Sequence, residues 1–322
     1  MKGPTILPHG DAAVARAAAL IATGGIVAVP TETVYGLAAD ATRADAVARI
    51  YAAKGRPSFN PLIVHVLDLA AAERIAVFDD DARVLAGAFW PGPLTLVLPV
   101  RAGAGLTPAV TAGLATVAVR VPAGRAMRAL LAACGTPLAA PSANRSGGIS
   151  PTSAAHVAAS LGGAVALVID DGDCPAGLES TIVAGREVLR PGPITGDAVS
   201  ARLHLGAGRG PDAMQPATEP GPGPRQGGVS APGQLASHYA PTKPVRLNAT
   251  TADADEWLIG FGPVAGDDTL SATGDLSEAA ARLFAALHRA DASRRQRIAV
   301  APVPPDGIGE AINDRLRRAA HR

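Results

Sequence analysis

A closely spaced pair of cations could bind a phosphate-containing ligand. Lys54 and Arg56 are separated by one glycine, and Pro57 follows them directly. Because glycine and proline fix the backbone here, the chain holds a point-charge donor close to a forked donor, as the oxygens of a polyphosphate require. The alternative is that both cations only complement the dipole of a helix that ends at this point.

Hydroxyl groups gather after an apolar segment that ends at Pro30. Thr31, Thr33 and Tyr35 follow it, with Glu32 among them. Ligands of open α/β sheets bind beyond the strand ends, so these hydroxyls could contact a small polar ligand. A polar turn with a solvated Glu32 explains the same residues equally well.

A second polar segment, residues 139–152, reads AAPSANRSGGISPT and lies between a predicted strand and a predicted helix. Its backbone N–H groups, the helix N-terminus and the Ser142 hydroxyl could together form an anion cradle. Two further strand edges with polar caps are GLESTI at 177–182 and LRPG at 189–192.

Two polar residues interrupt strands that should be buried. Arg120 stands within the run TVAVRVP, and an unpaired guanidinium there would cost several kcal/mol or more. It must therefore meet a carboxylate from the protein or from a ligand. His65 lies on an otherwise apolar strand, where a lone histidine is usually a core residue with its hydrogen bonds satisfied.

The elements that position these residues alternate between strand and helix patterns, which is typical of a sheet with helices packed on it. The predicted strands are Gly25–Val29, Leu62–Leu67, Leu94–Pro99, Val117–Val121, Pro137–Ala140, Ala166–Ile169, Ser180–Val183, Val188–Leu189, Pro244–Asn248, Glu256–Phe261 and Ile298–Val303. The predicted helices are Asp11–Ala22, Ala44–Ala53, Asp81–Phe89, Arg125–Ala133, Thr152–Leu161, Ser277–Arg289 and Gly309–Ala319. The pair Ser150-Pro151 is expected to introduce the helix at Thr152.

Composition indicates two globular α/β units joined by a linker. The chain has 322 residues, more than a single core usually holds. Between Gly206 and Gly233, 14 of 28 residues are Gly or Pro. The expected division is therefore an α/β unit at 1–205, a Gly/Pro-rich linker and lid at 206–242, whose His238 and Tyr239 could dock on a bound nucleotide, and a small α/β unit at 243–322. Lys and Arg balance Asp and Glu at 16 to 15, 2 to 2 and 11 to 11 in these three parts, which disfavours non-specific nucleic-acid binding.

The sequence lacks the motifs of several common enzyme classes. The sequence lacks GxxxxGK[ST], GxGxxG after a strand, HExxH and GxSxG. Cys134 and Cys174 lie far apart, so neither a disulfide framework nor a zinc site is expected. The N-terminal apolar stretch contains Arg16, Gly24 and Gly25 and does not read as a signal peptide, so we expect a cytoplasmic protein without a membrane span.

The order of the segments is more specific than any one of them. PTETVYGL, KGRPSFNPLIVH, WPGPLTLVL, VAVRVP, APSANRSG, ESTIV and LRPG succeed one another as in the YrdC-like threonylcarbamoyl-AMP synthases, which the chain resembles over about residues 10–200. Beyond the linker, HYAP at 238–241 and a small α/β unit are similar to the two-domain members. The chain departs from many relatives at 231–234, where it reads APGQ in place of SPGM, and in its long Gly/Pro tract.

The resemblance implies an α/β fold with a YrdC-like twisted mixed sheet and flanking helices, plus a smaller C-terminal α/β (Rossmann-like) domain. It implies that threonine is bound by Thr33, His65, Arg120, Ala140 (through its backbone) and Ser180. It implies that ATP is bound by Lys54, Arg56, Asn60, Thr116, Ser142, Ser150, Arg190 and Tyr239. No covalent nucleophile and no protein metal site are implied, and Mg²⁺ would be held mainly by the ATP phosphates.

The activity implied is synthesis of L-threonylcarbamoyladenylate from L-threonine, bicarbonate and ATP, with release of pyrophosphate. The product would supply a tRNA-modifying transferase that acts beside the anticodon, with transient tRNA contact. A carbamoyl-handling maturation enzyme is one alternative, although its relatives carry zinc fingers, for which two cysteines do not suffice. An RNA-binding module is the other, and the balanced charge disfavours it.

Overall fold

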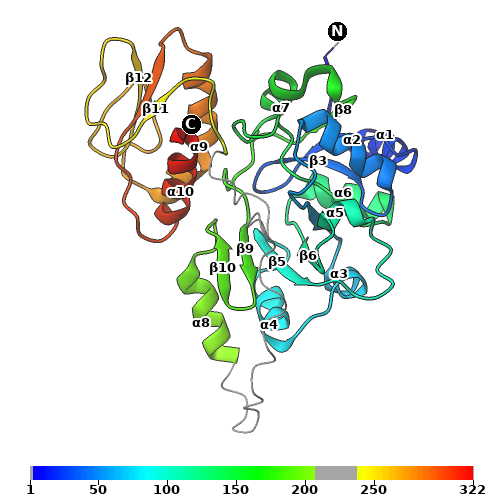
Figure 1. Cartoon of the computed structure of the whole chain (residues 1–322). Helices are drawn as coiled ribbons and strands as arrows, with labels where there is room; N and C mark the ends of the chain where they lie inside the picture. Colours follow the sequence, from blue (N-terminus) through cyan, green and yellow to red (C-terminus); the bar gives the residue numbers. More distant parts are fainter. Residues whose placement is uncertain (1–2, 207–237, 322) are drawn as a thin grey trace.

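The computed structural model describes residues 3–206 and 238–321 (Figure 1). Most of the linker expected at 206–242 lies outside the described residues. The two described parts each contain their own β-sheet. In Figure 1 the second part, coloured yellow to red, lies beside the green segments that follow β7 and precede β9.

The first part contains a ten-stranded mixed sheet in the order β1-β8-β2-β3-β7-β4-β6-β5-β9-β10. Its strands are β1 (Thr5–Pro8), β2 (Val27–Pro30), β3 (Tyr35–Asp40), β4 (Ile63–His65), β5 (Leu94–Pro99), β6 (Thr116–Arg120), β7 (Leu138–Ala139), β8 (Leu167–Asp170), β9 (Thr181–Ala184) and β10 (Glu187–Arg190). The sheet combines parallel pairs such as β4–β6 with antiparallel pairs such as β2–β3.

Helices cover both faces of this sheet. They are α1 (Asp11–Ala22), α2 (Ala44–Lys54), α3 (Leu69–Ile75), α4 (Asp80–Phe89), α5 (Pro108–Thr111), α6 (Arg125–Cys134), α7 (Ala154–Leu161) and α8 (Gly196–Gly206), with a 3-10 turn at Gly162–Ala164. Side chains of a strand alternate between faces, so Val27 and Val29 of β2 pack with α1 and α6, whereas Ala28 packs with α2. The sheet is therefore buried on both sides.

The second part has a four-stranded, all-parallel sheet in the order β11-β14-β12-β13. Its elements are β11 (Val245–Arg246), β12 (Glu256–Gly260), β13 (Asp268–Thr269), α9 (Leu276–Ala292), β14 (Arg297–Val300) and α10 (Gly309–Ala320). Helix α9 begins because the Asp275 carboxylate accepts a hydrogen bond from the Glu278 N–H, and its buried face carries Leu283, Phe284 and Leu287.

The predicted elements are largely present, with shifted ends and omissions. Helix α7 begins at Ala154 and not at Thr152, because Ser153 supplies the cap to the His156 N–H. Strands β1, β3 and β13 and helices α3, α5 and α8 were absent from the sequence prediction. Strand β3 consists mostly of small residues and carries an aspartate, which is a weak local strand pattern, and its pairing with β2 and β7 determines its conformation.

The two parts pack against each other through apolar and polar contacts. Val34, Ile149 and Leu178 of the first part belong to the same buried cluster as α9 and α10. Gly177 lies so close to α9 that an added Cβ would come within 2.4 Å of the Ala280 carbonyl oxygen. None of the described helices is both long and apolar enough to span a membrane.

Candidate active site

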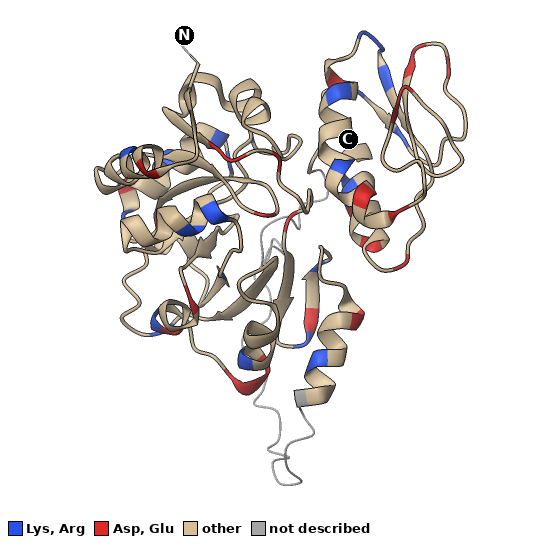
Figure 2. Cartoon of the chain, turned by 180° about the vertical axis from the view of Figure 1, so that it is seen from behind, with Lys and Arg blue, Asp and Glu red and all other residues tan. Residues whose placement is uncertain are grey.

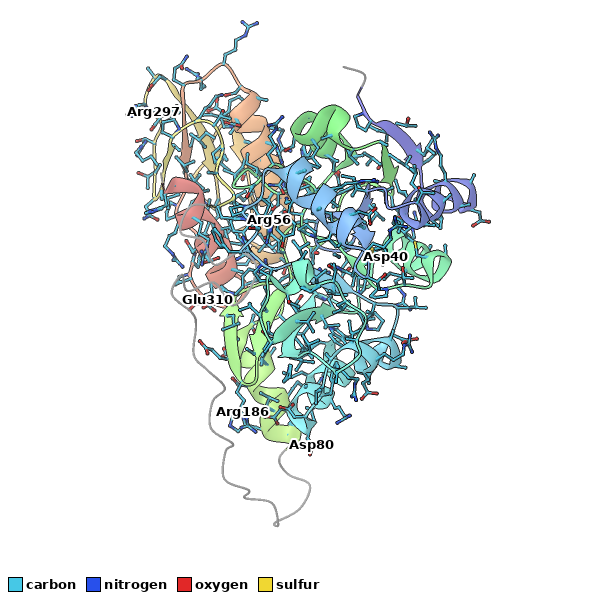
Figure 3. The ribbon with its side chains drawn as sticks, turned by 45° about the vertical axis from the view of Figure 1, so that its right-hand side comes forward. Asp40, Arg56, Asp80, Arg186, Arg297 and Glu310 are labelled. Atoms are coloured by element: carbon cyan, nitrogen blue, oxygen red, sulfur yellow. The ribbon has the colours of Figure 1, made fainter. Side chains whose placement is uncertain are left out.

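One cavity lies where the ends of several strands of the first sheet meet the start of the second part. It is lined by Thr31, Thr33, Val34, Gly36, Arg56, Ile63, His65, Arg120, Ala140, Pro141, Ser142, Glu179, Ser180, Arg190, His238 and Tyr239. Figure 3 shows Arg56 near the centre of the molecule, between α2 and the helices of the second part. The lining thus combines three guanidinium groups, several hydroxyl groups and one carboxylate.

Arg120 lies at the end of β6 and is buried, as expected for a central strand. Its Nη2 donates to the Glu32 carboxylate at 2.6 Å, its Nη1 to the Thr33 hydroxyl at 2.9 Å and its Nε to the Gly92 carbonyl at 3.2 Å. The protein itself therefore supplies the carboxylate that the sequence required. A guanidinium has five N–H groups, so two remain beyond these three bonds within the described residues, enough for a ligand carboxylate.

Glu32 pairs with Arg120 and its side chain is only 14% exposed, so a solvated turn at this position is wrong. Its other carboxylate oxygen accepts the Ala123 and Gly124 N–H groups, each at 3.0 Å. Burial by itself would raise the pKa of Glu32, but Arg120 and these hydrogen bonds outweigh burial and bring the pKa below its ordinary value. The carboxylate fixes Arg120 and the loop before α6 in one arrangement.

His65 lies beside Arg120, because β4 and β6 are parallel neighbours in register. Its ring is buried and its Nδ1 has no hydrogen-bond partner among the described residues. Burial, reinforced by the Arg120 charge, lowers the pKa of His65 to about 3. This histidine is therefore neutral. It is not a core histidine with all its hydrogen bonds satisfied, which was the alternative considered from the sequence.

Ser180 completes this end of the cavity. Its hydroxyl lies 2.7 Å from the Thr95 hydroxyl and accepts a hydrogen bond from Arg190 Nη2 at 3.1 Å. The same guanidinium donates to the Ser180 carbonyl at 2.8 Å. All five residues predicted to bind threonine line the one cavity: Thr33, His65, Arg120, Ala140 and Ser180.

Lys54 is the last residue of α2, and its ammonium group is buried. It donates to the carbonyl oxygens of Ser142 and Asn144, both at 2.5 Å. Burial, and then the nearby Arg56 charge, lowers the pKa of Lys54 well below its ordinary value. A cation merely complementing the dipole of its own helix would be solvated, whereas this one anchors the loop that carries Ser142.

Arg56 lines the cavity, and the loop after α2 holds it rigidly. Its Nη2 donates to the Asn60 side-chain oxygen at 2.6 Å and to the Pro61 carbonyl at 2.8 Å. Burial lowers the pKa of Arg56 to about 10, so it remains charged at neutral pH. Asn60 is thus placed to orient Arg56, and it lies outside the lining.

The remaining predicted ATP residues divide into two groups. Ser142, Arg190 and Tyr239 line the cavity, whereas Ser150 is buried just behind it and donates to the Glu179 carboxylate. Thr116 is the first residue of β6, about 13 Å along the strand from Arg120. The structure does not bring Thr116 into the lining, so a ligand that contacts it must extend beyond this cavity.

The segment that follows the undescribed residues forms one wall of the cavity. His238 and Tyr239 line it, and the Ala240 N–H donates to the Gly147 carbonyl at 2.8 Å. Tyr239 is fully buried against Phe284 of α9, with ring centroids 5.6 Å apart. The second part therefore holds this wall against the first.

Sequence reasoning gave no role to Glu179 or Arg315. Arg315 of α10 donates through Nε to the Glu179 carboxylate at 2.9 Å, and its guanidinium carbon lies 5.1 Å from the Tyr239 ring centroid. The signal for Arg315 was available, because it falls on the apolar face of α10 with Ile312 and Leu316, as Arg120 falls on a buried strand.

The site offers few protein ligands for a metal ion. No group of three or more His, Cys, Asp or Glu residues within the described ranges could hold one. Among the described lining residues Glu179 is the one carboxylate, and it already accepts hydrogen bonds from Ser150 and Arg315. These residues fit a Mg²⁺ ion that is held mainly by ligand phosphates.

The fold and the cavity together define a class of protein. A two-part α/β chain with a cavity of buried guanidinium and hydroxyl groups is suited to an anionic small molecule together with a small polar one. Six of the seven segments that the sequence presents in order contribute to the lining, and the seventh, at 90–98, contacts the lining residues Arg120 and Ser180 through Gly92 and Thr95.

Comparison with known proteins identifies the family. A family model described as "Telomere recombination" matches residues 19–192, and one described as "Threonylcarbamoyl-AMP synthase, C-terminal domain" matches residues 204–321. The chain is 38% identical to the threonylcarbamoyl-AMP synthase of Bacillus subtilis over 98% of its own length and 94% of the relative. It is also 38% identical to that of Pyrococcus abyssi over 94% and 93%.

Solved structures agree with this result. The crystal structure of P. abyssi Sua5 complexed with L-threonine superposes with a TM-score of 0.81 at 35% identity, and covers 98% of this chain and 96% of that one. The chain belongs to the threonylcarbamoyl-AMP synthase family, in its two-domain form, and is an enzyme of the nucleotidyltransferase type.

Proposed function

We propose that this enzyme makes L-threonylcarbamoyladenylate from L-threonine, bicarbonate and ATP and releases pyrophosphate. The observation that carries the proposal is that one cavity brings Arg120 and His65 together with Arg56 and Arg190. The relative from P. abyssi was solved with L-threonine, which supports a threonine site in this chain.

Threonine recognition would use the groups around Arg120. The two N–H groups of Arg120 left by its protein partners would bind the threonine carboxylate. The neutral His65 ring and the Ser180 hydroxyl are available for the polar side chain and the amine. A neutral imidazole can accept a hydrogen bond from an amine, which an imidazolium cannot.

The chemistry requires no enzyme nucleophile. The threonine amine would attack the carbon of CO₂ derived from bicarbonate and lose a proton, giving a carbamate. A carbamate oxygen would then attack the α-phosphorus of ATP, and the bond between that phosphorus and the bridging oxygen to the β-phosphate would break, releasing pyrophosphate. Buried guanidinium groups such as Arg56 and Arg190 would stabilise negative charge on the phosphates, since few waters compete with them there.

Mg²⁺ would enter with ATP and neutralise part of the phosphate charge. Lys54 and Asn60 would act through the groups they hold, namely the Ser142 loop and Arg56. Tyr239 and the second domain would shield the labile adenylate from water, which is a physical reason for a wall that both parts support.

The product would be used in the cytoplasm by a separate transferase that modifies tRNA beside the anticodon. Figure 2 shows positively and negatively charged residues interspersed on both parts of the chain, and the formal net charge is +1. Because this near-balance of charge disfavours non-specific binding to the phosphate backbone, we propose that tRNA contact is transient at most and that the RNA-binding alternative is the weaker one.

A direct assay tests the proposal. The full-length protein is incubated with labelled bicarbonate, ATP, Mg²⁺ and each of several amino acids, and pyrophosphate and adenylate products are measured. We expect label in an adenylate only when threonine or a close analogue is present. Pyrophosphate release that does not depend on an amino acid, or no release, would contradict the proposal.

A further inference from the structure

A buried carboxylate lies in a cavity that must accept a polyanion. Glu179 lines the cavity and is only 6% exposed. One of its oxygens accepts the Ser150 hydroxyl, and the other accepts Arg315 Nε at 2.9 Å. A bare carboxylate here would repel every phosphate that entered, because buried charges are poorly screened.

The neutralising cation comes from the other end of the chain. Arg315 is fully buried on α10 and lies 136 residues from Glu179 in sequence. Its Nη1 donates to Asp314 at 2.7 Å, while its Nη2 has no hydrogen-bond partner among the described residues. The same guanidinium lies over the Tyr239 ring, so it touches both the carboxylate and the aromatic wall of the cavity.

We propose that Arg315 is a positioning residue of the ATP site: it cancels the charge of Glu179 and holds Tyr239, so that the phosphates of ATP are accepted only when the second domain is docked. This inference rests on the proposed function, because it assumes that the anionic ligand of the cavity is ATP. Arg315 lies outside the cavity lining and acts through Glu179 and Tyr239.

Charge cancellation makes a prediction that simple loss of packing does not. With Arg315 replaced by methionine, the negative charge of Glu179 is no longer compensated. It should then lower the affinity for each ligand in proportion to the negative charge of that ligand. We expect affinity for ATP and for inorganic tripolyphosphate to fall at least about tenfold, whereas affinity for adenosine falls much less. Replacing Glu179 by glutamine in the same chain removes the carboxylate charge and keeps an acceptor oxygen for Ser150, so it should restore most of the lost affinity.

The experiment is isothermal calorimetry on the full-length protein with ATP, tripolyphosphate and adenosine as separate probes. The variants are Arg315→Met, Glu179→Gln and the double variant, and Arg317→Met on the exposed side of the same helix is the matched control. Circular dichroism and a thermal melt establish that each variant is folded at the temperature of the titration.

The outcomes separate the two proposals. If the wild-type chain binds no ATP, the proposed function fails. If it binds ATP and Arg315→Met binds all three probes as the wild type does, or weakens all three equally, the charge-cancelling role of Arg315 is overturned. If Arg315→Met does not fold, Glu179→Gln alone decides: it should bind tripolyphosphate at least as tightly as the wild type, and a clear loss of affinity would overturn the inference.

Discussion

The pair formed by Arg120 and Glu32 allows the sharpest prediction about the threonine site. Replacing Arg120 with methionine keeps much of the apolar volume of the side chain and removes its charge. Three hydrogen bonds are lost, to Glu32 at 2.6 Å, to Thr33 at 2.9 Å and to Gly92 at 3.2 Å. The Glu32 carboxylate, whose side chain is 14% exposed, then keeps only its two backbone donors.

Two separate losses follow from this geometry. Removing one partner of a buried ion pair typically costs about 3–5 kcal/mol of the free energy of unfolding, because the remaining charge is left uncompensated. Loss of a charge-assisted bidentate contact to the threonine carboxylate should cost about 1.5–3 kcal/mol of binding free energy, which is about ten- to hundred-fold in affinity. ATP affinity should change much less, since the proposed phosphate-binding groups are Arg56 and Arg190 and not Arg120.

Denaturant unfolding and threonine calorimetry measure the two losses independently. The double variant with Glu32→Gln should recover part of the stability but none of the threonine affinity, because the second change removes the stranded charge only. Arg125→Met is the control, since its ion pair with Asp171 involves a side chain that is 77% exposed and should contribute less than about 1 kcal/mol. Normal threonine affinity in Arg120→Met would refute the assignment.

Four further predictions follow from other residues. Replacing Lys54 or Arg56 with alanine should weaken ATP binding and slow turnover, whereas cations that only complement a helix dipole would cost at most about 1 kcal/mol of stability and leave turnover normal. Because the pKa of His65 is about 3 in the folded chain and ordinary in the unfolded one, stability should fall as pH drops from 6.5 toward 3. Replacing His65 with asparagine should flatten that fall in urea titrations at several pH values, while threonine affinity measured across pH 6.5 should show no inflection from this group in the native chain. Gly177→Val should separate the two parts, since its Cβ would overlap Ala280 and Ala281 of α9, and we expect faster proteolysis between the parts and lower activity than in Gly113→Ala, where nothing lies within 4 Å. A chain that ends at Leu205 should keep a cooperative thermal transition but lose most adenylate synthesis, and full activity there would show that the second part serves another purpose.

The sequence was sufficient for elements whose local pattern agrees with their surroundings. Helix α1 has the predicted bounds because its buried residues recur at helical spacing through Ala13, Ala17 and Ile21. Strand β1 escaped prediction because it is an exposed edge strand that pairs in parallel with β8, more than 150 residues later. Such long-range pairing leaves no trace in a local window of sequence.

The site shows the same division between local and distant information. The sequence pattern singled out Arg120, because it is a cation on a strand predicted to be buried. Its partner Glu32 lies 88 residues away, and no spacing in the sequence identifies it. Glu179 stood in a motif that the family resemblance quoted, but its meaning depends on Arg315 from the other part of the chain. Where two distant segments share one polar contact, the sequence indicates that a partner is needed without indicating which.

The place of Tyr239 in the chain has a consequence for biosynthesis. Every strand of the large sheet is complete by residue 190, so that sheet can form while the remainder of the chain is still being translated. The wall that carries His238 and Tyr239, and the Arg315 guanidinium that lies over the Tyr239 ring, come from residues that are translated later. During translation the large sheet can therefore fold before this cavity has the wall that the second part supports.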